Sequence, residues 1–340
     1  MKSIYDYSID ELKNYFQGIS EKPFRAVQLY EWLYKKRINS FDEITNMNKN
    51  IINRIKEDFN LDEITIVSKL QGKDVYKYLF KLRDGNTVEA VLMKQNYGNS
   101  LCVSTQVGCN MGCYFCESGR LKRLRNLEVN EMLLPILLIE KDLDIRISHV
   151  VLMGIGEPFD NYDNVIKFIN IINNPKGIDI GARHITVSTS GVVPQIEKFI
   201  NDGKQVNLAI SLHAPNDEIR NKLMPINKAY NISLLIKTIK KYIEATNRRV
   251  TMEYIMLKGI NDSVQNAIEL SNLLRGINCY VNLIPYNETS NSKFKKSNND
   301  DVMKFYDILK QNHINVTVRK EFGSKMMAAC GQLRANYKED

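Results

Sequence analysis

The chain has 340 residues, enough for two domains of ordinary size. Hydrophobic residues make up 44% and charged residues 25%, which excludes a disordered chain and indicates a sizeable core. The apolar stretch at 132–139, near the middle of the chain, is far shorter than the roughly 20 residues that a bilayer span needs. Asp6, Asp10 and Glu11 stand where a secretory signal would be apolar, so we expect a cytoplasmic protein.

The charge balance is basic, with 47 Lys and Arg against 39 Asp and Glu and a formal net charge of +8. A basic protein attracts polyanions, so nucleic acid is a natural partner. A solvated surface with a bias toward lysine explains the same excess equally well. The excess is concentrated in two short segments, 120–125 and 293–296.

Residues 1–63 are predicted to form a helical accessory domain. Helical patterns cover 10–16 and 24–36, and Ser40 and Asp42 offer N-cap chemistry ahead of a third helix. Residues 64–99 follow as a connector, because they alternate apolar and polar positions and turn at Asp84-Gly85-Asn86, a pattern typical of a β-hairpin.

Strands and helices alternate from residue 100 onward. Strands are predicted at 101–107, 149–153, 184–189, 206–212, 250–257, 280–284 and 316–319, with helices at 128–142, 161–173, 194–202, 231–246 and 263–275. This repeated βα alternation predicts an α/β fold, a parallel sheet curled into a full or partial barrel over 100–320. Ligands of such folds bind at the carboxyl ends of the strands. Residues 321–340 form a C-terminal tail.

The six cysteines are too few and too unevenly spaced for a secreted disulfide scaffold. Four of them fall within fifteen residues, while Cys279 and Cys330 stand alone. Clustered cysteines in a reducing compartment indicate metal or redox chemistry.

The strongest signal is the Cys-x3-Cys-x2-Cys loop formed by Cys109, Cys113 and Cys116 after the first barrel strand. Three thiolates this close can hold three irons of a 4Fe–4S cluster. No fourth cysteine continues the run, so one iron stays open for the amino and carboxylate groups of S-adenosylmethionine. An electron from the cluster would then cleave that molecule to a 5′-deoxyadenosyl radical. The alternative, a structural zinc site with a histidine ligand, is disfavoured because the four histidines show no matching spacing.

With this loop the sequence resembles the radical S-adenosylmethionine superfamily, whose fold is a partial (βα)6 barrel, and within it the RlmN/Cfr family of RNA adenine methyltransferases. The resemblance covers nearly the whole chain. Its matching segments are 101–109, 153–158, 188–194, 211–217, 225–227, 282–287 and 328–333, with 24–26 and 32–34 in the helical domain.

The resemblance implies a 4Fe–4S cluster held by the three loop cysteines and two S-adenosylmethionine molecules per turnover. The residues it assigns to S-adenosylmethionine are Gly156, Glu157, Ser188, Ser211, Leu212, His213 and Asn287. Without the resemblance, these residues do not indicate a cofactor site. The glycine-rich segment at 154–158 is typical of any tight turn, the polar side chains are typical of strand-end caps, and a lone histidine is more often structural.

The resemblance also implies a route around the low reactivity of adenine carbon 2, which carries no nucleophilic lone pair. The family first methylates a cysteine, matching Cys330, and the deoxyadenosyl radical then takes a hydrogen from the S-methyl group. The methylene radical adds to the ring, and a base matching Glu89 removes the ring proton. A thiolate matching Cys102 attacks the sulfur of Cys330, which releases the product and leaves a transient disulfide.

Without the resemblance, these three residues would carry no such roles. Glu89 would be a solvated charge on a strand, and Cys102 and Cys330 would be buried structural thiols. Cys279 keeps that structural interpretation and is assigned no role.

The motifs favour the housekeeping branch of the family, which methylates carbon 2, over the resistance branch, which methylates carbon 8. The proline after Gly156-Glu157 and the segment 211–215 carry this preference. Three residues depart from the family pattern: Glu117, Lys325 and Met327. A different class, a non-catalytic RNA-binding protein with a structural metal site, is the remaining alternative.

The implied partners are 23S rRNA, tRNA and a one-electron reductant such as flavodoxin, with no membrane. The basic segment offers phosphate contacts, which would make RNA binding strongly salt-dependent. A solvated, charged helix face is the equally good alternative. The residues concerned are Arg120, Lys122, Arg123 and Arg125.

Overall fold

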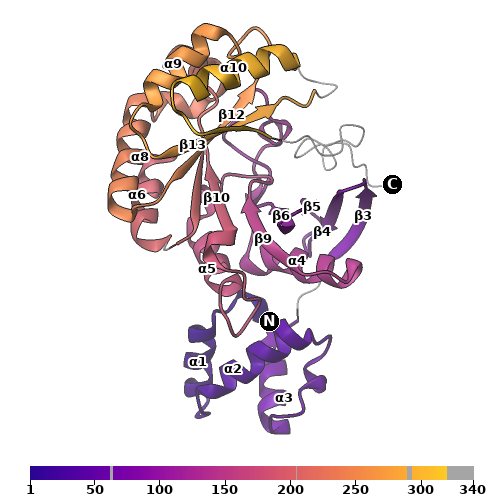
Figure 1. Cartoon of the computed structure of the whole chain (residues 1–340). Coiled ribbons are helices and arrows are strands. Elements are labelled where there is room, and N and C mark those ends of the chain that lie inside the picture. The colour runs from indigo at the N-terminus through magenta and orange to yellow at the C-terminus, as the bar shows by residue number, and fades with distance from the viewer. Residues whose placement is uncertain (62–63, 204, 289–292, 320–340) are drawn as a thin grey trace.

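The computed structural model describes residues 1–61, 64–203, 205–288 and 293–319, and shows a small helical lobe beneath a larger α/β lobe (Figure 1). The helical lobe contains α1 (Ile9–Gly18), α2 (Phe24–Tyr30) and α3 (Lys49–Asp58). A short parallel pair, β1 (Lys2–Ser3) with β2 (Phe59–Asn60), brings the two ends of this lobe together.

Helix starts in this lobe follow local capping chemistry. Ser8 and Glu11 form a capping box that begins α1. The expectation that Ser40 precedes the third helix is wrong, because Ser40 and Glu43 cap only a single 3-10 turn, Phe41–Glu43. The side chain of Asn48 accepts from a backbone N–H of the first turn and starts α3. The predicted helix at 24–36 is α2 followed by a π-helical turn, Glu31–Lys36.

One sheet of ten strands organises the described part of the larger lobe, in the order β14-β13-β12-β11-β10-β9-β6-β5-β4-β3. Strands β6 and β9 to β14 run parallel, and β3 to β6 run antiparallel. Among the described residues the edge strands β14 and β3 do not pair with each other, so the barrel is partial. The strands are β3 (Thr65–Gln71), β4 (Val75–Lys81), β5 (Thr87–Gln95), β6 (Gly98–Val103), β9 (Ile147–Leu152), β10 (Ile185–Thr189), β11 (Asn207–Ser211), β12 (Val250–Met256), β13 (Cys279–Pro285) and β14 (Val316–Val318).

Helices follow the parallel strands and cover the outside of the curled sheet (Figure 1). They are α4 (Val129–Leu143), α5 (Tyr162–Ile172), α6 (Val193–Asp202), α8 (Ile232–Thr246), α9 (Val264–Leu274) and α10 (Asn299–Gln311). The alternation of strands and helices is the predicted α/β fold. Two helices were not predicted: α10, and the short α7 (Asp217–Leu223) after β11. No helix of the described ranges is long and apolar enough to cross a membrane.

Residues 65–95 extend the barrel sheet. The predicted turn closes the β4–β5 hairpin, where Leu82 N–H donates to the Asn86 carbonyl at 2.7 Å and Gly85 has a φ of +84°. The expected single hairpin is a three-stranded meander, because β3 pairs with β4 on the other side. Strand β5 pairs in turn with β6, so this meander forms one wall of the barrel interior.

Candidate active site

A cavity of about 400 Å³ lies at the carboxyl ends of the parallel strands. Its wall combines the cysteine loop, the ends of β9 to β13 and the inner face of the β4–β5 meander. A volume of this size suits a small-molecule cofactor. Ligand binding at the strand ends, predicted from the βα alternation, therefore has a matching cavity in the structure.

The cysteine loop is held in a tight conformation beside this cavity. Gly108 has a φ of +84°, and a Cβ there would lie 2.2 Å from the backbone oxygen of Lys122. Cys109 N–H donates to the Leu121 carbonyl at 2.7 Å, which pins the start of the loop to its return segment. Cys109, Cys113 and Cys116 all line the cavity.

The three thiols suit a multi-iron cluster. Burial raises the pKa of Cys109 to about 12 and raises that of Cys113 and Cys116, and the neighbouring thiols further disfavour ionisation of Cys109 and Cys113. A cation that binds all three sulfurs would supply the missing compensation. Within the described residues no three potential ligands converge as a single metal ion requires. A polynuclear cluster is wider and takes thiolates that surround it.

Glu157 anchors the turn after β9. Its Oε1 accepts from Phe159 N–H at 3.1 Å, and its Oε2 accepts from Ser190 N–H at 2.7 Å. Burial raises the pKa of Glu157, although these hydrogen bonds oppose the rise. Gly156 has a φ of +110°, and a Cβ there would lie 2.7 Å from that of Gln106. The turn therefore needs glycine for both conformation and space.

Three further predicted cofactor residues, Ser188, Ser211 and Asn287, reach the same cavity. Leu212 differs, because its side chain is fully buried and lies outside the set of described residues that line the cavity. Its backbone N–H donates to the Glu253 carbonyl at 3.1 Å, so Leu212 contributes packing at the end of β11.

His213 is a buried, neutral side chain in the wall of this cavity. Its Nδ1 accepts from Ile255 N–H at 3.0 Å, and its backbone has a φ of +57°. Burial and the nearby Arg220 cation lower the pKa of His213 to about 3. Because Nδ1 is an acceptor, the ring proton belongs on Nε2, which makes His213 a hydrogen-bond donor there.

Arg220 on α7 is a site residue that the sequence did not reveal. Its fully buried guanidinium donates to the carbonyls of Ser190 at 2.7 Å and Ser211 at 3.3 Å, and to Asn227 Oδ1 at 2.9 Å. Burial lowers the pKa of Arg220 to about 10. Arg220 thus ties the ends of β10 and β11 to the loop after α7. One arginine in a charged helical segment carries no signal of burial.

The meander wall brings Glu89 and Cys102 near each other. Glu89 is 3% exposed, so the expectation of a solvated charge is wrong. Its Oε2 lies 3.6 Å from Nζ of Lys77, which was not predicted. Cys102 and Lys77 line the cavity, whereas Glu89 is not among the described residues that line it. Burial raises the pKa of Cys102 to about 11, and the cation of Arg319 opposes that rise.

Cys330, Lys325 and Met327 lie outside the described residues. Glu117, the third departure from the family pattern, is buried beside the cysteine loop. Its Oε1 lies 3.9 Å from Nη1 of Arg120. Cys279 is buried at the start of β13, and its burial agrees with a structural role.

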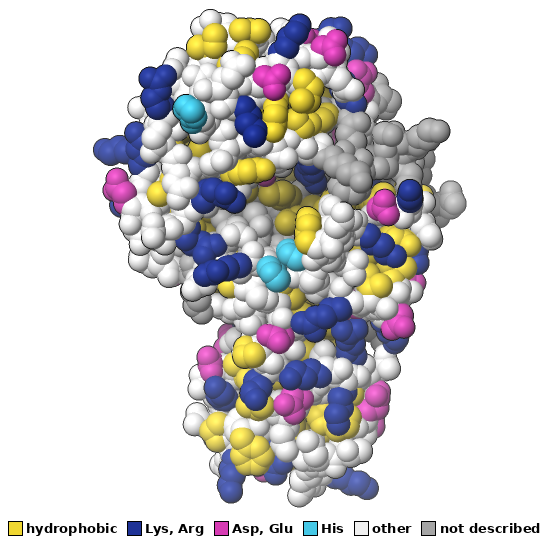
Figure 2. All heavy atoms as spheres, in the orientation of Figure 1, with side chains coloured by type: hydrophobic (Ala, Val, Ile, Leu, Met, Phe, Trp, Pro, Cys, Tyr) yellow, Lys and Arg dark blue, Asp and Glu magenta, His cyan; other side chains and the backbone are white. Residues whose placement is uncertain are grey.

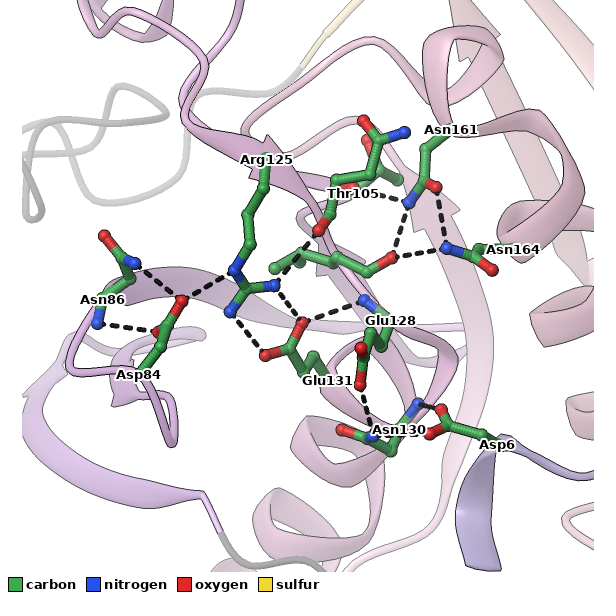
Figure 3. Close-up of polar contacts among 12 residues, drawn as sticks. Asp6, Asp84, Asn86, Thr105, Arg125, Glu128, Asn130, Glu131, Asn161 and Asn164 are labelled. Carbon is green, nitrogen blue, oxygen red and sulfur yellow. Dashed lines mark hydrogen bonds and ion pairs between the residues drawn. The ribbon is translucent and has the colours of Figure 1, made fainter. Parts of the chain in front are cut away.

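The basic segment does not form a helix face. Arg125 donates to both oxygens of Glu131 at 2.7 and 2.8 Å and to Asp84 at 2.7 Å (Figure 3). Arg123 donates to Asp160 at 3.2 Å. Both guanidinium groups therefore hold the loop to its neighbours, and the bidentate pair of Arg125 with Glu131 also fixes its geometry. Arg120 and Lys122 remain exposed.

The same network reaches the helical lobe. Asn130 donates to both carboxylate oxygens of Asp6, at 2.8 and 2.9 Å, at the start of α4 (Figure 3). Lys167 on α5 pairs with Glu11 on α1 at 2.7 Å. Lys and Arg side chains are spread over both lobes on the face in Figure 2, with Asp and Glu among them. No single basic patch dominates that face.

Comparison with known proteins matches residues 103–271 to the radical SAM superfamily and residues 2–61 to the ribosomal RNA large subunit methyltransferase N-terminal domain. Relatives named "Probable dual-specificity RNA methyltransferase RlmN" include proteins of Spiroplasma citri, 52% identical over 98% of each chain, and Enterococcus faecalis, 51% identical over 98% of this chain and 96% of that one. A solved radical SAM methyltransferase from Sphaerobacter thermophilus is 38% identical with a TM-score of 0.92, over 98% of this chain and 99% of that one.

Proposed function

Because the chain belongs to the RlmN family of radical S-adenosylmethionine RNA methyltransferases, we propose that it methylates carbon 2 of an adenine in 23S rRNA, and of adenine in tRNA. The observation that carries this proposal is the shared cavity. The loop cysteines, the strand-end residues and Cys102 all face it. Cofactor binding and thiol chemistry are therefore possible in one space.

The family uses a 4Fe–4S cluster and S-adenosylmethionine, two molecules per turnover. Cys109, Cys113 and Cys116 would hold the cluster, which supplies one-electron cleavage of S-adenosylmethionine when bound. Gly156 and Glu157 would form the turn against which the methionine part binds. Ser188, Ser211, His213 and Asn287 would contribute polar groups from neighbouring strand ends, and Leu212 packing.

The chain's own residues would divide the remaining work. Cys330 would carry the methyl group as S-methylcysteine, and Glu89 would accept the proton from carbon 2. Cys102 would attack the sulfur of Cys330 as a thiolate, which forms a disulfide and frees the product. Burial raises the pKa of Cys102, and the cations of Arg319 and Lys77 would favour the ionisation that this attack needs.

The proposed partners follow from this chemistry. RNA is bound with the help of Arg120 and Lys122, which are exposed beside the cysteine loop. A one-electron reductant such as flavodoxin would supply the electron, and we place the reaction in the cytoplasm.

The direct test is nucleoside mass spectrometry of unmodified 23S rRNA treated with anaerobically reconstituted protein, S-adenosylmethionine and a reductant. We expect 2-methyladenosine. Formation of 8-methyladenosine would instead assign the resistance chemistry. The absence of any methyladenosine, with four irons per chain present, would contradict the proposal.

Variants of the three cysteines outside the cluster loop separate their roles. Cys330→Ala should abolish methylation with its iron retained, and Cys102→Ala should accumulate a covalent protein–RNA adduct, seen on a denaturing gel. Cys279→Ala is the matched control, since Cys279 is buried at the amino end of β13. Full turnover by Cys102→Ala without adduct would remove Cys102 from the mechanism.

A further inference from the structure

The wall of the cavity that carries Cys102 also contains a buried lysine. Lys77 on β4 lies opposite Val91 on β5, which lies opposite Cys102 on β6. Side chains in one such row share a face of the sheet. Glu89 is two residues before Val91, so Glu89 is the diagonal neighbour of Lys77 on that face.

The Lys77–Glu89 pair is almost completely withdrawn from solvent. The two side chains are 4% and 2% exposed, and Nζ lies 3.6 Å from Oε2. Lys77 lines the cavity, and Glu89 lies beside it on the same face of the sheet. Lysine is almost never buried this far without a partner. At the other end of the same strand, Lys81 is exposed.

Stability does not account for this pair. Removing two charges from water costs several kcal/mol per ion, and apolar residues of similar volume in their place are often neutral or more stabilising. Val75, Val91 and Met93, the neighbours of Lys77 on these strands, line the cavity with apolar side chains. A charged pair at this point of an apolar wall therefore needs a functional reason.

We propose that Lys77 is a positioning residue for Glu89 in the methyl-transfer reaction, an inference that rests on the proposed function. Its ammonium holds the buried carboxylate in the ionised form and beside the cavity. When carbon 2 of the RNA-bound ring gives up its proton, the C–H bond breaks, its electron pair stays with the ring and an O–H bond forms on Glu89. Lys77 keeps its three protons throughout.

The electrostatic reason is burial. An isolated carboxyl group withdrawn from water favours its neutral form, which cannot accept a proton. Among the described residues, the charged and titratable groups on this side of the cavity include Lys77 from β4, Glu89 from β5, Cys102 from β6 and Arg319 after β14, and Glu253 on β12 lines the same cavity. Arg319 interacts electrostatically with Cys102 and with the buried carboxyl group of Glu253 on β12. Lys77 is in direct contact with Glu89, at 3.6 Å between Nζ and Oε2.

The test compares Lys77→Met, Lys77→Arg and the control Lys81→Met in the reconstituted holoenzyme. Two products are measured by mass spectrometry over a range of pH: S-methylation of Cys330 and methyladenosine in 23S rRNA. Lys77→Met should retain Cys330 methylation but form methyladenosine about a hundredfold more slowly at neutral pH. Alkaline pH should restore much of that rate, since it ionises Glu89 without Lys77. Lys77→Arg should restore activity at neutral pH, and Lys81→Met should match the wild type.

Three results would overturn the proposal: a wild-type rate and pH profile for Lys77→Met, a loss that is the same at every pH, or a simultaneous loss of Cys330 methylation. If Lys77→Met fails to fold, the double variant Lys77→Met/Glu89→Gln removes both charges, and its slow reaction should show no alkaline recovery. Recovery in that variant would exclude Glu89 as the titrating group. Absence of methyladenosine from the wild-type reaction would contradict the proposed function itself, and this proposal with it.

Discussion

The carboxylate of Glu157 accepts a 2.7 Å hydrogen bond from the backbone N–H of Ser190, which joins the turns after β9 and β10. The carbonyl of Ser190 in turn accepts from Arg220 at 2.7 Å. The buried carboxyl group of Glu157 and the buried guanidinium of Arg220 therefore set the positions of three segments around the cavity. Both contacts are made with backbone groups of Ser190.

Glu157→Gln should loosen these turns. The amide keeps one acceptor oxygen but presents an NH2 group to a backbone N–H that now donates to the carboxylate. Leaving a buried donor unsatisfied costs about 1–3 kcal/mol. We expect a lower free energy of unfolding in urea and weaker S-adenosylmethionine binding by isothermal titration. Unchanged values for both would show that the two hydrogen bonds contribute little.

Gly108→Ala should impair cluster assembly. Its Cβ would meet the Lys122 carbonyl at 2.2 Å, so the cysteine loop would have to shift. Gly85→Ala is the matched control, because Gly85 has the same φ of +84° with open space around its Cβ. Gly85→Ala therefore measures only the free-energy cost of placing an alanine at a positive φ, which is roughly 1 kcal/mol. We expect iron per chain, measured after reconstitution, to fall in Gly108→Ala alone; equal iron contents would contradict this.

His213 should make stability depend on pH below neutrality. Its pKa is about 3 in the folded protein, against 6.5 for the free side chain, so the unfolded state gains a proton first as the pH falls. The contribution of neutral His213 to the free energy of unfolding is therefore full above pH 6.5. Between pH 6.5 and about pH 3 the free energy of unfolding falls by roughly 1.4 kcal/mol per pH unit. His213→Asn keeps an acceptor for Ile255 N–H and tolerates a positive φ. Urea unfolding should show a shallower pH slope for this variant, and parallel slopes would refute the assignment.

The basic segment should separate into RNA-binding and structural residues. Lys122→Gln should weaken RNA binding and reduce the salt dependence of log K by about one unit, with an unchanged melting temperature. Arg125→Gln should lower the melting temperature, since it breaks contacts to Glu131 and Asp84. Fluorescence anisotropy at several salt concentrations and thermal unfolding distinguish the two. A lowered melting temperature for Lys122→Gln would contradict this division.

Several features of the molecule were predictable because they depend on local pattern. The alternation of apolar strands with amphipathic helices predicted a parallel sheet, and the spacing of Cys109, Cys113 and Cys116 predicted a shared loop. The turn at Asp84-Gly85-Asn86 was predictable for the same reason, since a positive φ at glycine is a local requirement. The predicted start of the third helix was less accurate, because two residues in this segment can act as N-caps. Ser40 caps a 3-10 turn, and Asn48 caps α3.

By itself, the sequence determined the α/β class of this protein and the cysteine loop. Their physical causes, periodicity and spacing, act over neighbouring residues. Only the tertiary structure decided the surroundings of the charged side chains. Glu89 is buried because β4 and β6 flank its strand, and Arg220 because the ends of β10 and β11 and the loop after α7 surround it. Arg125 is paired with Asp84, which lies 41 residues away in the chain. Burial and pairing depend on contacts between segments far apart in the chain, which no local pattern encodes.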